Sequence, residues 1–215
     1  AAWHPDPAST PAYFDSLFFS DDPGDGLTSL REYYRDNSHG RLLISGRVTP
    51  AWLTMPHSYA YYVNNYSGLD FGGYPRNAQR LAEDAMTAAY AAFGNDLGFF
   101  DNDGPDGIPH SADDDGYVDA VCVIHPGLGA EVLPGYLSTQ AIWSHQAGIS
   151  IYSDCPTGTS SPSCLPGMML GNVRGYLYTV CAEYYDAPQD GAVGTYFHEF
   201  GHTIGLVDLY GYQGA

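Results

Sequence analysis

The sequence contains no lysine, and its seven arginines stand against 25 aspartates and glutamates, so that the formal net charge is −18. A protein that binds nucleic acid through its phosphates needs a cationic surface, which this composition does not provide. The sequence also lacks an apolar run of membrane-spanning length, because its longest runs, such as residues 120–124, are only as long as a strand. Nucleic-acid binding and a membrane-spanning segment are therefore not expected.

Cysteine is scarce too, and the four cysteines are of two kinds. Cys155 and Cys164 flank a polar loop with no other feature to hold it, which predicts a disulfide bond between them. Closing so short a loop contributes about 2 to 3 kcal/mol and indicates an oxidising compartment. Cys122 and Cys181 lie in apolar runs typical of strands, so both are expected to be buried, and they could pair only if those strands are neighbours.

A length of 215 residues corresponds to one domain, or to one domain and part of another, with enough chain for a substantial core. Residues 1–20 are proline-rich and predict an irregular N-terminal arm. Beyond the arm, hydrophobic periodicity predicts helices over residues 30–37, 76–93 and 193–206 and strands over residues 42–48, 118–125, 141–145 and 176–183. Helices and strands mixed in this order indicate an α/β layer architecture.

Two of these elements carry specific predictions about burial. The helix over residues 76–93 places Leu81 and several alanines on its core-facing side and Glu83 and Asp84 away from it. The continuous apolar run over residues 118–125 suits a strand covered on both faces. The short run at residues 141–145 is expected near the edge of the sheet.

The most informative segment is residues 198–208, which read HExxHxxGxxD within an apolar helical pattern. Because a helix turns about 100° per residue, His198 and His202 lie on one face and can share one cation. Catalytic zinc sites use imidazole and carboxylate ligands and keep one position for water. Glu199 lies beside that water, so it is predicted to be the general base that takes the proton and passes it to the leaving amine.

Gly205 and Asp208 complete the pattern. Glycine tolerates the left-handed conformation in which a helix ends and the chain reverses, and this turn would bring Asp208 to the cation as third ligand. The alternative is a buried helix whose histidines only form hydrogen bonds, but two histidines and a glutamate on a core helix are costly without partners. The buried stripe of this helix is expected to comprise Val193, Tyr196, Phe197, Phe200 and Ile204.

Two acidic, glycine-rich runs, residues 101–107 and 113–119, place carboxylates at alternating positions of tight turns. Calcium takes six to eight oxygen ligands, which such runs supply. Neither run has the EF-hand pattern, because glutamate is missing from its twelfth position. The prediction is a calcium site, and the alternative is a pair of solvated turns that lead into a strand. The best calcium ligands are Asp101, Asp103, Asp115 and Asp119.

His125 and His145 each lie at the end of an apolar strand. A single histidine in such a place is usually a hydrogen-bonded structural residue. This interpretation is favoured over zinc ligation for both residues.

Several separate segments of the chain resemble the immune inhibitor A family of secreted metalloproteases, which are metzincin-type zincins. The likeness lies in SLREYY at residues 29–34 with GRL at 40–42, DDGYVDA at 114–120, HPG at 125–127, IWSH at 142–145, and the zinc helix with LY at 209–210. These segments together span most of the chain.

The resemblance implies a zincin or metzincin-like catalytic domain with a twisted mixed sheet, a backing helix and an active-site helix beneath the sheet. It implies hydrolysis of protein or peptide substrates outside the cell, with zinc on His198, His202 and Asp208 and with Glu199 as base. Metzincins also have a methionine-containing turn beneath the metal, whereas the nearest methionines here, residues 168 and 169, precede the helix. Residues 21–215 are therefore expected to be the upper part of the catalytic domain, without the lower subdomain that follows it.

Other functions remain to be weighed against a zinc endopeptidase. One is a calcium-stabilised binding or adhesion module whose zincin site is vestigial, although the intact Glu199 argues against a site that has lost its activity. Another is zinc-dependent hydrolysis of an amide that is not a peptide. Bound zinc, together with proteolysis that a chelator blocks, distinguishes the endopeptidase from the binding module.

Overall fold

The computed structural model describes residues 4–24, 26–149, 165–188, 190 and 193–208. Its helices are α1 (Pro11–Phe19), α2 (Leu30–Asn37), α3 (Tyr59–Val63), α4 (Ala78–Ala92) and α5 (Val193–Thr203). Its strands are β1 (Val121–Leu128), β2 (His145–Gly148), β3 (Met168–Leu170), β4 (Val173–Gly175) and β5 (Leu177–Tyr184). Within the described ranges, no helix combines the length and the apolarity that crossing a membrane requires. The predicted disulfide between Cys155 and Cys164 falls outside the described residues.

Three strands form a mixed sheet in the order β1-β5-β2, and β3 and β4 form a separate antiparallel pair. β1 runs parallel to β5 with Val121 opposite Tyr178, and β2 runs antiparallel to the other side of β5 with His145 opposite Val180. β5 is therefore the central strand, and its residues 178–183 are all buried. The predicted α/β architecture is confirmed, although the strand covered on both faces is β5 and not the run over residues 118–125.

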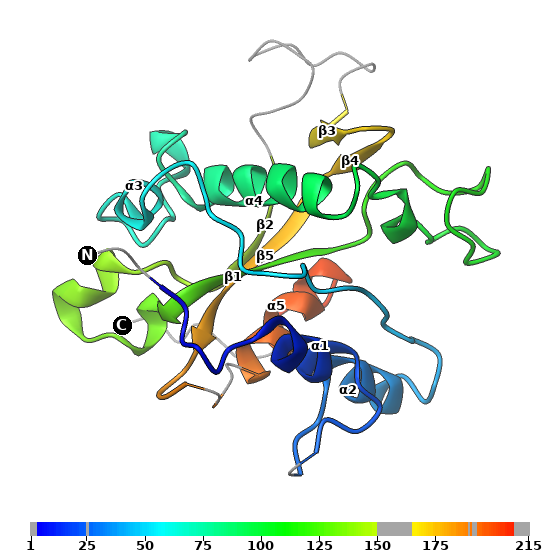
Figure 1. The fold of residues 1–215 in the computed structure, drawn as a ribbon, viewed down its shortest axis with the longest axis horizontal. Helices are drawn as coiled ribbons and strands as arrows, with labels where there is room; N and C mark the ends of the chain where they lie inside the picture. Colours follow the sequence, from blue (N-terminus) through cyan, green and yellow to red (C-terminus); the bar gives the residue numbers. More distant parts are fainter. Residues whose placement is uncertain (1–3, 25, 150–164, 189, 191–192, 209–215) are drawn as a thin grey trace.

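The sheet lies between two layers of helices (Figure 1). α4 covers one face, whereas α5, with α1 and α2 beyond it, covers the other. Side chains alternate along β5, so that Tyr178 and Val180 join the core beneath α4 while Cys181 joins the core around α5. The core around α5 is rich in aromatic side chains, including Phe14, Phe18, Tyr34 and Tyr196.

The N-terminal segment differs from its prediction, because residues 11–19 form helix α1 and not an irregular arm. Thr10 caps this helix by accepting a hydrogen bond from the backbone N–H of Tyr13 at 3.2 Å. Pro11 is the first helical residue, a position where its missing N–H costs nothing. The prolines that predicted irregular structure therefore mark the beginning of a helix that buries Phe14 and Phe18.

Helix α4 confirms the helix predicted over residues 76–93, but the burial predicted for its carboxylates is wrong. Glu83 and Asp84 are buried because each has polar partners inside the protein. Asp84 accepts a hydrogen bond from the Tyr62 hydroxyl at 2.7 Å and pairs with Arg80 at 2.8 Å. Glu83 accepts hydrogen bonds from Gln79 of the same helix at 3.0 Å and from the Tyr74 hydroxyl at 3.1 Å. Partners contributed by other segments cannot be read from the periodicity of the helix.

The predicted strand over residues 42–48 does not form, since none of the strands in the described part of the chain pairs with this segment. Its apolar residues nevertheless pack into the core around α5, where Ile44 is buried. β1 and β2 begin later than predicted, because Val118 and Trp143 give their backbone N–H groups to Arg174 and Ser67 and not to β5. Apolar alternation thus predicts which residues of these segments are buried, whereas strand formation depends on whether another strand lies alongside.

Cys122 and Cys181 lie on neighbouring strands, as pairing between them would require. Both are free thiols in the structure, and only Cys181 is buried. The expected burial of Cys122 is wrong because β1 is an edge strand, so its residues are covered less completely than those of the central β5.

Candidate metal centre

Helix α5 carries the HExxH residues and packs against β5 and β2. Tyr196 fixes the helix to the sheet, because its buried hydroxyl donates a hydrogen bond to the carbonyl of Ala182 at 2.7 Å and lies 3.0 Å from that of Glu183. On the side away from the sheet, the Tyr196 ring stacks on Phe18 of α1, with 5.3 Å between ring centres. The helix is therefore held between the sheet and α1.

Helix α2 holds α5 at a second point. The Tyr34 hydroxyl donates a hydrogen bond to the backbone carbonyl of Phe197 at 2.7 Å. A Cβ atom on Gly201 would lie 2.9 Å from that hydroxyl oxygen, so the glycine inside the HExxH motif permits the close approach. Tyr34 and Gly201 are thus positioning residues that sequence analysis did not identify. Ile204, predicted to be buried, is 41% exposed because it lies beyond the end of the helix.

Replacing Tyr34 with phenylalanine is expected to lower the free energy of unfolding by about 1 kcal/mol, since the Phe197 carbonyl loses the hydrogen bond from the hydroxyl. Urea denaturation measures this change. The matched control is Tyr33→Phe, because the Tyr33 ring stacks on Phe197 and is partly exposed. Equal destabilisation by the two substitutions would show that the Tyr34 hydroxyl does not hold the helix.

The three predicted zinc ligands come together after the turn that follows α5. Gly205 has a φ of +85°, the left-handed conformation expected there, and it returns the chain toward the helix. His198 Nε2 and His202 Nε2 lie 3.1 Å apart, and Asp208 Oδ1 lies 3.2 Å from the first and 3.3 Å from the second. The three side chains thus converge through one atom each.

This triangle of atoms suits zinc. Tetrahedral zinc with ligand bonds of about 2.0 to 2.1 Å has its ligand atoms about 3.3 Å apart. His202 Nδ1 lies 2.9 Å from the carbonyl oxygen of Leu206, so a proton on Nδ1 would form a hydrogen bond with that carbonyl. In this tautomer Nε2 is unprotonated, and its lone pair is free to bind the metal. Two imidazoles and a carboxylate are the donor types of a catalytic zinc site, which has room for a further ligand.

Glu199, the predicted general base, is 7% exposed. Burial raises its pKa to about 7, and the carboxylates of Glu131 and Asp208 act in the same direction, whereas His202 and the backbone of Gln146 act against it. A carboxylate with a pKa near neutrality can both accept and return a proton in one reaction cycle.

Glu199 and His198 open into a cavity of about 280 Å³. Part of its wall comes from Glu131, Trp143 and Ser144, which belong to the segment between β1 and β2. Glu131 is not predictable as a site residue from the sequence, because an isolated glutamate in a connecting segment forms no recognisable motif. Pairing of β1 and β2 with opposite sides of β5 brings this segment to α5.

His125 and His145 are not part of the group of candidate zinc ligands. His125 Nδ1 lies 3.1 Å from the carbonyl oxygen of Pro126, and His145 Nδ1 lies 2.7 Å from that of Trp143. Burial lowers the pKa of His125 to about 4 and also lowers the pKa of His145. Each ring thus forms the predicted hydrogen bond through Nδ1, while the Nε2 atom of each is buried without a hydrogen-bond partner among the described residues.

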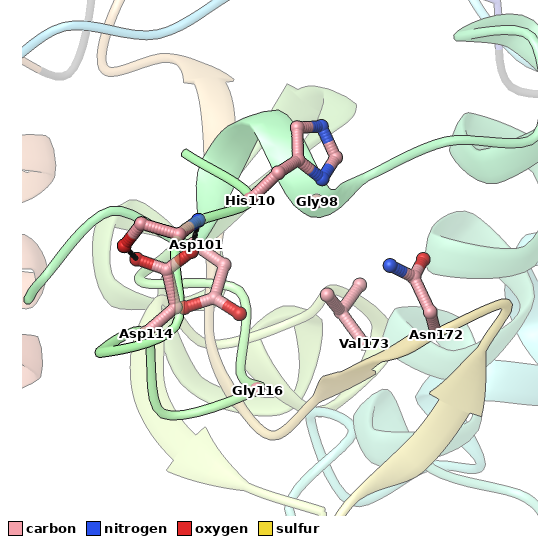
Figure 2. A pocket seen from close by; sticks show the side chains of 8 residues that line it. Gly98, Asp101, His110, Asp114, Gly116, Asn172 and Val173 are labelled. Carbon is pink, nitrogen blue, oxygen red and sulfur yellow. Dashed lines mark hydrogen bonds between the residues drawn. The ribbon is translucent and has the colours of Figure 1, made fainter. Parts of the chain in front are cut away.

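The acidic runs form a second cavity, of about 250 Å³, far from α5 in sequence (Figure 2). Asp101 and Asp114 lie on one side of this cavity, and Asn172 and Val173 lie across from them. Carboxylate oxygens of Asp101, Asp103 and Asp115 lie within 4.8 Å of one another, so the structure brings together three of the four predicted calcium ligands. Asp119, the fourth, is not a member of that group.

The electrostatics of this acidic cluster are unfavourable without a cation. Asp101 is 3% exposed, and its Oδ1 atom has no hydrogen-bond partner among the described residues. Burial raises the pKa of Asp101, and so do the charges of Asp114, Asp115 and Asp103. Burial and the charges of Asp103, Asp101 and Asp115 raise the pKa of Asp119 to about 6. The charges of the cluster therefore act on Asp119 even though Asp119 lies outside the group of three.

Comparison with known proteins gives consistent matches over most of the chain. A family model described as immune inhibitor A peptidase M6, catalytic domain, matches residues 7–215. Immune inhibitor A of Bacillus thuringiensis subsp. alesti is 33% identical over 212 residues, which cover 92% of this chain and 28% of that protein. Pre-pro-metalloprotease PrtV of Vibrio cholerae serotype O1 is 29% identical over 208 residues, which cover 94% of this chain and 22% of that protein. The chain thus spans about a quarter of the length of these curated relatives.

Proposed function

The chain belongs to the immune inhibitor A peptidase family, and from this premise we propose that it is the zinc-binding part of a secreted endopeptidase. The observation that carries the proposal is the triangle of ligand atoms from His198, His202 and Asp208, with edges of 3.1 to 3.3 Å. These distances suit a single tetrahedral zinc ion. The name of the Vibrio relative, a metalloprotease, agrees with this proposal.

Zinc, when bound, polarises a peptide carbonyl and makes a water molecule more acidic. Glu199 then acts as the general base, since its buried carboxylate opens into the same cavity as His198. It accepts the proton of the attacking water and gives it to the leaving amine. Tyr34 and Tyr196 act indirectly, because they hold α5 against α2 and β5 and so fix where Glu199 lies.

The proposal extends to the organisation and location of the domain. We propose that residues 21–215 form the upper part of a metzincin-like catalytic domain, with α4 as the backing helix and α5 as the active-site helix. Helix α1 belongs with this part, because it packs on α2 and on Tyr196. The proposed substrates are proteins or peptides outside the cell.

Elemental analysis and a proteolysis assay on the same preparation test the proposal. About one zinc per chain is expected, with casein cleavage that stops after chelation and returns when zinc is added back. A protein that takes up no zinc and cleaves nothing would favour the binding or adhesion module. Zinc uptake with hydrolysis of small amides but not of casein or peptides would favour an amidohydrolase.

We also propose that the acidic cluster of Asp101, Asp103 and Asp115, with Asp119 beside it, holds a structural calcium ion. The buried Asp101 supports this proposal, because it lines the cavity and its Oδ1 atom has no hydrogen-bond partner among the described residues. Calcium binds six to eight oxygen atoms, so carbonyl groups and water would complete the ligand set. The ion would offset the repulsion that raises the pKa of both Asp101 and Asp119.

Calcium is expected to raise the melting temperature, because the folded cluster binds the ion and the unfolded chain binds it poorly. A free calcium concentration about 100 times the dissociation constant stabilises the folded state by about 2.7 kcal/mol, or roughly 5 to 10 °C. Melting curves with and without calcium, in zinc-containing buffer, measure the shift. Asp115→Ala should reduce it, whereas Asp15→Ala, which removes an exposed carboxylate from α1, should not. If calcium changes the melting temperature of neither the parent protein nor the two variants, the acidic cluster is a pair of solvated turns without an ion.

A further inference from the structure

We propose that the cavity beside Glu199 is a subsite for a cationic substrate side chain, lysine or arginine, and that Glu131 recognises its charge. This inference rests on the proposed peptidase function and names the substrate side chain that the function would select. It is carried by the position of the cavity, by the uncompensated charge of Glu131 and by the way in which the carboxylate is fixed.

The cavity lies at the proposed reaction centre. His198 and Glu199 form one end of it, and Gly194 and Thr195, one helical turn earlier, extend the same wall. A Cβ atom on Gly194 would meet nothing within 4 Å, so this wall leaves the cavity open. At about 280 Å³ the cavity has room for one long side chain of a peptide substrate.

Glu131 contributes a negative charge that no cationic side chain among the described residues neutralises. The chain has no lysine, all seven arginines lie within the described ranges, and the ion pairs that they form are with other carboxylates. His125 and His145 are buried, and burial lowers the pKa of both, so neither is cationic at neutral pH. The third nearby ring, His198, lines the cavity and is a proposed zinc ligand, which binds as the neutral imidazole. A carboxylate in a cavity without a cationic partner attracts a positively charged group.

The carboxylate is held in place before any substrate arrives. Ser144 donates to it twice, from its hydroxyl at 2.6 Å and from its backbone N–H at 3.2 Å. Ser144 is itself buried, and its hydroxyl oxygen lies 3.4 Å from the backbone nitrogen of Ala182 in β5. A Cβ atom on Gly129 would overlap both carboxylate oxygens, so the absence of a side chain there makes the space that Glu131 occupies. Both Ser144 hydrogen bonds come from neutral groups and leave the negative charge intact.

Trp143 adds an aromatic surface to the same cavity. Its indole is 44% exposed and lies next to Ser144 in the chain. The methylene stem of a lysine or arginine can pack on an indole while the charged end reaches a carboxylate. The net charge of −18 also favours the approach of cationic peptides over anionic ones.

Binding of two matched inhibitors tests the proposal without relying on turnover. The probes are two short peptide hydroxamates that differ only in one side chain beside the zinc-binding group, lysine in one and norleucine in the other. We expect the zinc-loaded chain to bind the lysine probe roughly tenfold more tightly at low salt, as a hydrogen-bonded charge pair would give. The advantage should shrink as ionic strength rises, because salt screens a partly exposed pair.

Two substitutions assign the preference to Glu131. Glu131→Gln keeps the shape and should bring the ratio of the two dissociation constants close to one, while affinity for the norleucine probe stays within about twofold. Gly129→Ala should lower the ratio too, because the added methyl group displaces the carboxylate without a change of charge. Melting curves show whether each variant is folded. If Glu131→Gln is not folded, Gly129→Ala provides the test.

The outcomes separate this proposal from the proposed function. A ratio near one in the parent protein, or an unchanged ratio in folded Glu131→Gln, would overturn the cationic subsite while zinc-dependent hydrolysis stands. If neither probe binds and zinc is not taken up, the proposed function fails and the subsite fails with it. A lysine preference that both variants reduce establishes Glu131 as a specificity-determining residue.

Discussion

Replacing Glu199 with glutamine is expected to lower turnover at least about a hundredfold while zinc remains bound. The amide has nearly the shape of the carboxylate, but it cannot accept a proton from the attacking water. The three proposed zinc ligands are unchanged, so the metal content should be that of the parent protein. Casein cleavage and elemental analysis on one preparation measure both quantities.

The combination of these two measurements makes the result specific. Lost activity together with lost zinc would indicate a damaged site and not a missing base. Unchanged activity would show that another group takes the proton, and Glu131, the other carboxylate in the cavity, would then be the next candidate. Michaelis parameters also help, because loss of a base should lower kcat with little effect on KM.

Replacing Asp208 with alanine is expected to weaken zinc binding by more than about a hundredfold. Substituting residues that only orient zinc ligands already costs about 10- to 100-fold in affinity, and removing one of three protein ligands should cost more. Competition with a chromogenic chelator measures the zinc affinity. The rate of proteolysis should fall together with the zinc affinity. Added zinc should restore proteolysis only in part, because the remaining histidines do not hold the ion in the same position.

A matched control distinguishes the loss of a ligand from the loss of an acidic residue. Asp15→Ala removes an exposed carboxylate from α1 and should leave zinc affinity unchanged. Full zinc retention in Asp208→Ala would mean that this carboxylate only orients a histidine and that another group completes the ligand set. The distances of 3.2 and 3.3 Å from Asp208 Oδ1 to the two histidine nitrogens favour direct ligation.

The part of the site that could be predicted from sequence is local. Helix geometry alone places His198 and His202 on one face, with Glu199 beside them, whatever the rest of the chain does. The turn at Gly205 needs only a residue that accepts a left-handed conformation, and three residues later it delivers Asp208. Helices α2 and α4 were predicted for the same reason, since their caps and periodicity lie within the elements themselves.

The errors arose where a distant partner determines the structure. Glu83 and Asp84 look like exposed helix residues until Tyr74 and Tyr62, which lie outside α4, supply hydrogen bonds to them. The apolar alternation of residues 42–48 is real, but no strand of the described ranges pairs with this segment, so Ile44 is buried in the core without strand pairing. A local sequence pattern indicates which residues are buried, but it does not indicate which segment packs against them.

The sequence by itself therefore determined the main helices of this protein and predicts the proposed metal ligands and the proposed base, because each depends on residues a few positions apart. Only the tertiary structure decided which strand is central and which carboxylates meet. It joined Asp101 and Asp103 to Asp115 across a dozen residues, and it left Asp119 outside that group. It also brought Glu131 to the cavity beside Glu199, 68 positions further along the chain, through the pairing of β1 and β2 with β5. Contacts of this kind follow from strand order and register, which local periodicity does not encode.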